Sequence, residues 1–170
     1  MPITIQVPPR TLLVLCGPAC SGKSTFAAQR FMPTMIVSSD FCRALICDDT
    51  TSQSVNQDTF DLFYYIINKR LYQQRFTVAD STALYPEARF KLLDVARRHN
   101  YATCLLIFNI PEAVCAERNP GRERKVDDAV MPYHAKLLRQ TLLDTPDEGW
   151  QQLYVLGESD MDVVIKVGAN

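Results

Sequence analysis

The 170-residue chain lacks several features that mark other classes of protein. No apolar run approaches the roughly 20 residues that a membrane helix needs. The opening stretch, MPITIQVPPR, has no charged segment followed by an apolar one, as a signal peptide would have. We therefore expect a cytoplasmic protein without a membrane partner.

The cysteine patterns of disulfide scaffolds and zinc sites are also missing. The six cysteines form no C-x-x-C pair, and no Cys/His cluster has the spacing of zinc ligands. Reduced thiols that act as small apolar groups are the expected state. Cys20 stands apart, because it falls inside the phosphate-binding motif described below.

An excess of positive charge is absent as well. The chain has 18 Lys and Arg against 19 Asp and Glu, which gives a formal net charge of −1. Proteins that coat long nucleic acids usually carry a strongly basic face. A nucleic-acid substrate would therefore have to be held locally, near an end.

Short apolar runs alternate with helical patterns along the sequence. Buried strands are predicted at 12–15, 35–37, 76–79, 103–108 and 153–156, with an edge strand at 163–167. Helices are predicted at 22–30, 41–47, 58–74, 86–99, 111–118 and 130–143. This alternation predicts a three-layer α/β/α fold with a parallel central sheet. Residues 1–170 are expected to form one domain.

Residues 17–24, GPACSGKS, match the phosphate-loop motif G-x-x-x-x-G-K-[ST] at every fixed position. An apolar strand precedes the motif and a helical pattern follows it, as the motif requires. We expect Lys23 to reach the β- and γ-phosphates of ATP and the Ser24 hydroxyl to ligate Mg²⁺. The expected ATP-binding residues are Gly17, Pro18, Ala19, Cys20, Ser21, Gly22, Lys23, Ser24 and Thr25. A glycine-rich turn without a ligand is the structural alternative.

Asp40 follows the second predicted strand, at the edge of the sheet where ligands bind in open α/β folds. A carboxylate there can take the proton of an attacking hydroxyl. Arg43 would share one helix face with Asp40 and could hold an acceptor phosphate by a bidentate bond. In the alternative, Asp40 only caps a helix and Arg43 is a solvated surface residue.

Asp80 ends the third strand. It could hold waters bound to Mg²⁺ by hydrogen bonds, or cap the next turn, and the sequence leaves both interpretations open.

Arginines crowd into an expected lid at about residues 117–134. Arg118, Arg122 and Arg124 could stabilise ATP phosphates from a mobile segment. Neighbouring acidic residues could instead make this stretch an ordinary solvated charge run. His134, at the end of the lid, stands alone and receives no predicted role.

The chain resembles the 5′-kinase domain of bacterial polynucleotide kinase-phosphatases. The resemblance spans nearly the whole chain and is carried by GPACSGKSTFA, VSSDFCRALICDD, FDLFYYIINKRL, FTVADST and VCAERNPGRERKV. It implies a P-loop kinase fold with an arginine-rich lid, Lys23 and Ser24 as ATP and metal contacts, Asp40 as general base and Arg43 as the clamp on the acceptor strand. It also implies that Arg118 and Arg122 hold ATP phosphates, with Arg124 a weaker match because the lid is one residue shorter than in the family.

The predicted activity is therefore transfer of the γ-phosphate of ATP, or another nucleoside triphosphate, to 5′-OH ends of RNA or DNA in nucleic-acid repair. The resemblance also implies phosphatase and ligase modules, in the full-length protein or in separate chains. Two alternatives stay open. One is a kinase for a small-molecule hydroxyl on a nucleotide, sugar or antibiotic, and the other is a nucleotide-dependent switch without transfer activity.

Overall fold

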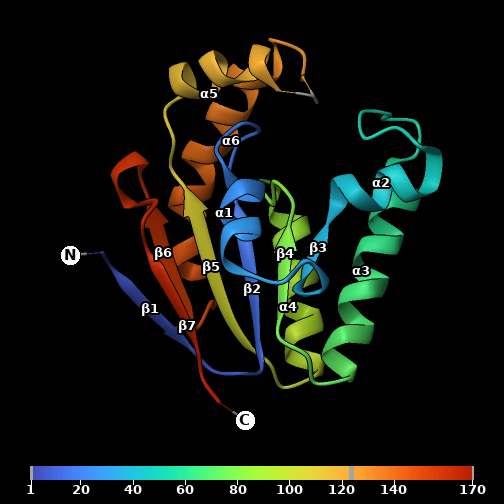
Figure 1. Cartoon of the computed structure of the whole chain (residues 1–170), viewed down its shortest axis with the longest axis vertical. Coiled ribbons are helices and arrows are strands. Elements are labelled where there is room, and N and C mark those ends of the chain that lie inside the picture. The colour runs from blue at the N-terminus through green and yellow to red at the C-terminus, as the bar shows by residue number, and fades with distance from the viewer. Residues whose placement is uncertain (1, 123–124, 170) are drawn as a thin grey trace.

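The computed structural model describes residues 2–122 and 125–169 of the chain. Its central sheet has five strands in the order β3-β4-β2-β5-β6, and every neighbouring pair is parallel. The strands are β2 (Thr11–Cys16), β3 (Ile36–Ser38), β4 (Thr77–Asp80), β5 (Ala102–Phe108) and β6 (Gln152–Leu156). Figure 1 shows β2 in the middle of this sheet.

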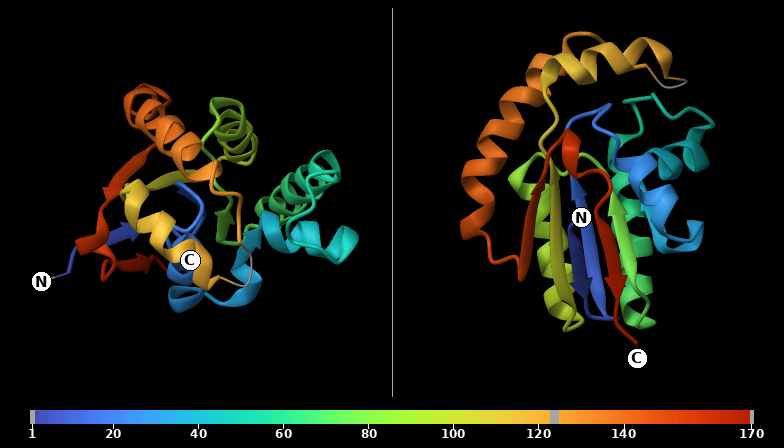
Figure 2. Two further views of the ribbon diagram at one scale, coloured as in Figure 1. Left: turned by 90° about the horizontal axis from the view of Figure 1, so that it is seen from above. Right: turned by 60° about the vertical axis from the view of Figure 1, so that its left-hand side comes forward.

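Helices cover both faces of the sheet and form the outer layers. They are α1 (Lys23–Arg30), α2 (Ser39–Cys47), α3 (Asn56–Tyr72), α4 (Pro86–Arg98), α5 (Glu112–Arg118) and α6 (Val130–Asp144). Seen from above, α3, α4 and α6 stand along one face, and α1 lies on the other (Figure 2). The three-layer α/β/α fold predicted from the sequence is confirmed.

The strand β2 contributes side chains to both hydrophobic cores, because successive side chains point to opposite faces of the sheet. Leu13 and Leu15 pack into the core on the α1 side, whereas Leu12 and Val14 pack into the core beneath α3, α4 and α6. All six residues of β2 are buried, as expected for a central parallel strand. The loop that follows β2 therefore starts from a fully buried strand.

A second, two-stranded sheet was not expected. Its strands are β1 (Thr4–Val7) and β7 (Val164–Val167), which pair in parallel. The predicted strand at 163–167 exists, but it pairs with β1 and not with the edge of the main sheet. Ile5, Val7 and Val163 join the core on the α1 side, so this small sheet covers apolar surface that the single helix α1 leaves uncovered.

Within the described residues, no helix is both long enough and apolar enough to cross a bilayer. All six cysteines are free thiols, as predicted, and five of them are buried.

Candidate active site

The phosphate loop connects β2 to α1 and passes close to β5. A Cβ added to Gly17 would lie 2.9 Å from Cβ of Phe108, so a larger residue would collide with β5. Gly22 has a φ of +95°, which glycine adopts without steric strain. The two fixed glycines of the motif thus have separate structural reasons to be glycine.

The ammonium of Lys23 lies across its own loop. Nζ donates to the carbonyl oxygens of Gly17 at 2.8 Å and Pro18 at 2.7 Å. Burial lowers the pKa of Lys23, and the nearby charge of Asp80 acts in the opposite direction. Because hydrogen bonds to charged oxygens are stronger than those to carbonyls, a phosphate in the loop can replace these partners.

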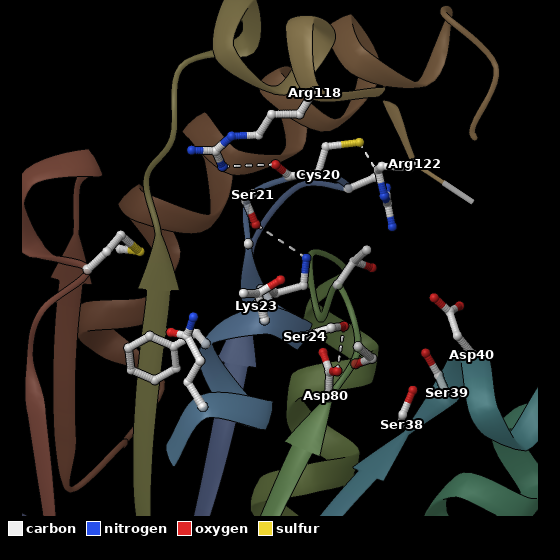
Figure 3. A pocket seen from close by; sticks show the side chains of 18 of the residues that line it. Cys20, Ser21, Lys23, Ser24, Ser38, Ser39, Asp40, Asp80, Arg118 and Arg122 are labelled. Carbon is white, nitrogen blue, oxygen red and sulfur yellow. Dashed lines mark hydrogen bonds between the residues drawn. The ribbon is translucent and has the colours of Figure 1, made fainter. Parts of the chain in front are cut away.

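Ser24 and Asp80 meet on the floor of the site (Figure 3). The Ser24 hydroxyl donates to Oδ2 of Asp80 at 2.8 Å. Burial raises the pKa of Asp80, while the charge of Lys23 and the hydrogen bond from Ser24 lower it. The pair supplies hard oxygen donors next to the phosphate loop, which is the donor chemistry that Mg²⁺ prefers. These residues therefore fit the metal that the motif implies.

Sheet register places Asp80 next to two other functional segments. Asp80 pairs with Leu15 of β2 on one side and with Ser38 of β3 on the other. The three strands therefore end together, and their carboxyl ends carry the phosphate loop, Asp80 and the start of α2. The general rule that ligands bind at this edge of an open α/β sheet holds here.

Asp40 lies in the first turn of α2, across the pocket from Lys23 and Ser24 (Figure 3). The helix is capped by Ser38, whose Oγ accepts the Phe41 amide at 3.2 Å, so the reading of Asp40 as the N-cap is wrong. The half-buried Asp40 is also close enough to Asp80 to raise its pKa slightly. Its carboxylate is thereby positioned at the helix N-terminus, where a negative charge is stabilised.

Arg43 is buried rather than solvated, contrary to the surface alternative. Only 4% of its surface is exposed, and Nη1 donates to the Ser52 carbonyl at 2.7 Å and to Oδ1 of Asn56 at 2.6 Å. These bonds join α2 to the loop before α3. Among the described residues, Nε of Arg43 has no hydrogen-bond partner. The guanidinium thus keeps one buried donor that the protein does not satisfy.

The described part of the expected lid lies above the phosphate loop at the end of the sheet (Figures 1 and 3). Arg118 Nη1 donates to the Cys20 carbonyl at 3.1 Å, and Arg122 Nη1 lies 2.8 Å from the Cys20 sulfur. The short 3₁₀ turn Asn119–Gly121 separates the two arginines. Both guanidiniums therefore converge on the tip of the loop at Cys20. Arg124 lies outside the described residues.

Two cavities open around these side chains. The P-loop pocket, of about 450 Å³, is lined by the loop, Ser24, Asp80 and the two lid arginines. The α2–α6 cleft, of about 990 Å³, is lined by α2, the starts of α3 and α4, and α6. Five residues line both cavities: Ala19, Ser39, Asp40, Ser81 and Thr82. Asp40 therefore stands on the wall that the two cavities share.

The cleft also contains side chains for which the sequence gave no prediction. Tyr85, before α4, and Tyr133, in α6, are 46% and 48% exposed, and their hydroxyls are hydrogen-bonded to each other. His134 accepts the Ala19 amide through Nδ1 at 3.0 Å, so it is not the isolated residue that the sequence suggested. A sequence signal for His134 exists, because it shares one stripe of α6 with the buried residues Met131, Leu138 and Thr141.

A phosphate loop after a central parallel strand, with a carboxylate beyond the neighbouring strand and arginines above, defines a P-loop kinase fold. The chain belongs to the AAA domain family, whose model matches residues 12–142 and hence well over half of the sequence. A search of curated proteins gives no significant match.

Several solved structures share this fold. A chain of the Pnkp1/Rnl/Hen1 RNA repair complex matches with a TM-score of 0.67 at 18% identity, over 78% of this chain and 45% of that one. A gluconokinase from Sinorhizobium meliloti 1021 matches with a TM-score of 0.55 at 17% identity, over 89% and 84% of the two chains. The APS kinase CysC of Mycobacterium tuberculosis, in complex with AMPPNP and APS, gives 0.54 at 14% identity, over 89% and 90%.

The match to the RNA repair complex agrees with the family resemblance seen in the sequence. This chain spans less than half of the matched chain in that complex. At these identities the likenesses establish the P-loop kinase fold, which the polynucleotide and small-molecule kinases share.

Proposed function

We propose that the protein is a polynucleotide 5′-hydroxyl kinase that transfers the γ-phosphate of ATP to the 5′-OH end of RNA or DNA. The position of Asp40 carries this proposal. Its carboxylate lies on the wall between the P-loop pocket and the larger α2–α6 cleft. ATP in the pocket and a hydroxyl in the cleft would meet at this side chain.

In the proposed reaction, the acceptor oxygen forms a bond to the γ-phosphorus while the bond to the β,γ-bridging oxygen breaks. The acceptor proton passes to Asp40, and ADP leaves. Lys23, Arg118 and Arg122 stabilise the charge that spreads over the transferred group, because all three reach the phosphate loop.

Mg²⁺ would be held by Ser24, with Asp80 supporting its waters, and would neutralise charge on the phosphates when bound. Within the described residues, no group of three or more His, Cys, Asp or Glu side chains could hold a metal ion. Phosphate oxygens of the nucleotide, together with waters, would therefore supply the remaining ligands. This explains why a nucleotide and a metal would bind together.

Two features of the α2–α6 cleft favour a polynucleotide over a small acceptor. The cleft, at about 990 Å³, has room for more than one nucleotide unit beyond Asp40. Its half-exposed tyrosines, Tyr85 and Tyr133, offer aromatic surfaces on which bases stack without sequence preference. Arg43 lines this cleft and has a buried Nε without a hydrogen-bond partner among the described residues, so its guanidinium suits a backbone phosphate near the 5′ end.

The second candidate is a kinase for a small-molecule hydroxyl. The near-neutral net charge of −1 suits such an acceptor, and the fold is shared with a gluconokinase and an APS kinase. The same pocket, carboxylate and arginines would serve either acceptor. The two candidates therefore differ only in what occupies the cleft.

A transfer assay with matched acceptors separates the candidates. Labelled γ-phosphate transfer would be measured to a 5′-OH oligonucleotide, to the same oligonucleotide carrying a 5′-phosphate, and to gluconate, adenosine and an aminoglycoside. The proposal predicts transfer to the 5′-OH oligonucleotide alone, in RNA or DNA form. Transfer to a small alcohol with no labelling of the oligonucleotide would refute it and support the second candidate.

The proposed cellular role is end repair in the cytoplasm, together with phosphatase and ligase activities on the same full-length protein or on separate chains. A 5′-phosphate is the group that a ligase joins to a 3′-OH. The expected product of this kinase is thus a substrate for strand joining.

A further inference from the structure

His134 connects α6, the helix in which the expected lid ends, to the phosphate loop. It lies in the second turn of α6, and its Nδ1 accepts the main-chain N–H of Ala19 at 3.0 Å. The two residues are 115 positions apart in the sequence. This contact is a direct hydrogen bond between α6 and the third residue of the motif.

The hydrogen bond fixes the tautomer of the imidazole. A backbone N–H can only donate, so Nδ1 must be unprotonated and the ring proton must lie on Nε2. Burial and the charge of Lys23 lower the pKa of His134 to about 4. The ring is therefore neutral at physiological pH, with one nitrogen as acceptor and the other as donor.

The ring of His134 contacts the phosphate loop and also lines the α2–α6 cleft. Nδ1 accepts from Ala19, which lines both cavities, and His134 itself is among the residues that line the cleft, as is Tyr133. Among residues 2–122 and 125–169, only Nδ1 of this ring makes a hydrogen bond. The Nε2–H group thus has no acceptor among the described residues, and it belongs to a side chain that lines the cleft.

The Ala19 amide is directed at α6, so it is engaged by His134 and not by a phosphate in the loop. The next residue, Cys20, has a φ of 68°, an uncommon conformation for a residue other than glycine. A hydrogen bond that fixes Ala19 restrains the chain just before this turn. Restraint of the loop is valuable because anion binding needs the following amides to converge before the phosphate arrives.

We propose that His134 is a positioning residue with two separate tasks: its Nδ1 holds the phosphate loop in its binding conformation, and its Nε2–H donates to an oxygen of the acceptor in the cleft. The second task rests on the proposed transfer function, and the first does not. The assignment predicts that the two nitrogens can be separated by substitution.

Asparagine and glutamine provide the test, because each replaces one nitrogen of the ring. In His134→Asn the side-chain oxygen is bonded to Cγ, as Nδ1 is, and can still accept from Ala19. In His134→Gln the amide nitrogen lies one bond further out, near the place of Nε2. His134→Ala removes both groups and serves as the reference for full loss.

Nucleotide affinity would be measured by calorimetric titration with ADP and Mg²⁺, without any acceptor, together with thermal unfolding. One hydrogen bond predicts that His134→Ala and His134→Gln bind about 5- to 10-fold more weakly, whereas His134→Asn stays within about 2-fold of wild type. Equal affinity for the Asn and Gln variants, or wild-type affinity for His134→Ala, would overturn the loop-holding role whatever the substrate is.

The acceptor role would be measured as the KM for a 5′-OH oligonucleotide at saturating ATP. His134→Asn should raise this KM about 5-fold or more, whereas His134→Gln should leave it near the wild-type value. The reverse order, or no difference between the two variants, would remove Nε2 from the acceptor site. An inactive wild type with the predicted ADP affinities would contradict the proposed function and leave the loop-holding role standing.

Discussion

The hydroxyl of Ser24 donates to the carboxylate of Asp80 at 2.8 Å, on the floor of the P-loop pocket. This hydrogen bond joins the start of α1 to the end of β4. It is formed by the two side chains that we propose to hold Mg²⁺ and its waters. The carboxylate is 5% exposed, and its burial without a metal is costly. Function, rather than stability, is therefore the reason to expect an acid at this position.

Asp80→Asn should weaken the response to Mg²⁺ and raise stability. Burial raises the pKa of Asp80 in the folded state, so the unfolded state favours ionisation. Below its unfolded pKa of 3.8 the carboxyl is neutral in both the folded and the unfolded protein, so it does not destabilise the fold there. As pH rises above 3.8 and through the higher folded pKa, the cost of ionising the buried carboxyl lowers the free energy of unfolding. We expect Asp80→Asn to have a higher melting temperature than wild type at pH 7 and the same melting temperature at pH 3. We also expect the variant to need at least about 10-fold more Mg²⁺ for half-maximal transfer. Thermal unfolding and Mg²⁺ titration check these points.

Arg43 should help to bind the acceptor and should also stabilise the connection between α2 and α3. Its Nη1 bonds to Ser52 and Asn56 are lost in Arg43→Ala, which would cost about 2 to 3 kcal/mol of stability and raise the KM for the oligonucleotide. The KM for ATP should stay unchanged, because Arg43 does not line the P-loop pocket. An equal rise in both KM values would show that Arg43 supports the whole site and not the acceptor side alone.

Arg118→Ala and Arg122→Ala should each slow transfer by about 10²-fold, because each removes a guanidinium from the tip of the phosphate loop. Single-turnover rates at saturating ATP measure this effect. Arg97→Ala is a matched control, since Arg97 is an exposed arginine at the end of α4. If Arg97→Ala slowed transfer as much as the lid variants do, the loss of rate would come from the change in net charge and not from the position of the arginine.

The tyrosine pair should matter only for polynucleotide acceptors. Tyr85→Ala and Tyr133→Ala remove stacking surface worth about 1 to 3 kcal/mol per base, which predicts a rise of at least about 5-fold in oligonucleotide KM. The matched phenylalanine variants keep the ring and should bind nearly as wild type. If phenylalanine is as harmful as alanine, the hydroxyl pair and not stacking supports the cleft.

The sequence was most informative where local chemistry decides the structure. Gly17 and Gly22 specify the phosphate loop. Gly17 allows the loop to lie close to Phe108, and Gly22 adopts a left-handed backbone conformation. The start of α2 is specified by Ser38, which caps the helix that carries Asp40. The left-handed turn at Gly22 and the cap of α2 depend on neighbours within a few residues, whereas the close approach of Gly17 to Phe108 of β5 is predicted only through the motif.

Contacts between distant segments were the part that the sequence did not reveal. The hydrogen bond from Ala19 to His134 and the pairing of β1 with β7 join segments more than 100 positions apart. The burial of Arg43 depends on how the loop at 48–55 folds back toward α3. Four alternating residues in β1 carry too little signal to be distinguished from a polar terminus.

The central claim is that Asp40 accepts the proton of the attacking hydroxyl. Single-turnover transfer to a 5′-OH oligonucleotide should be compared for wild type, Asp40→Asn and Asp48→Asn, an exposed aspartate at the other end of α2. The account predicts a loss of about 10²-fold or more for Asp40→Asn, with ADP affinity unchanged and Asp48→Asn at the wild-type rate. A wild-type rate in Asp40→Asn would contradict it.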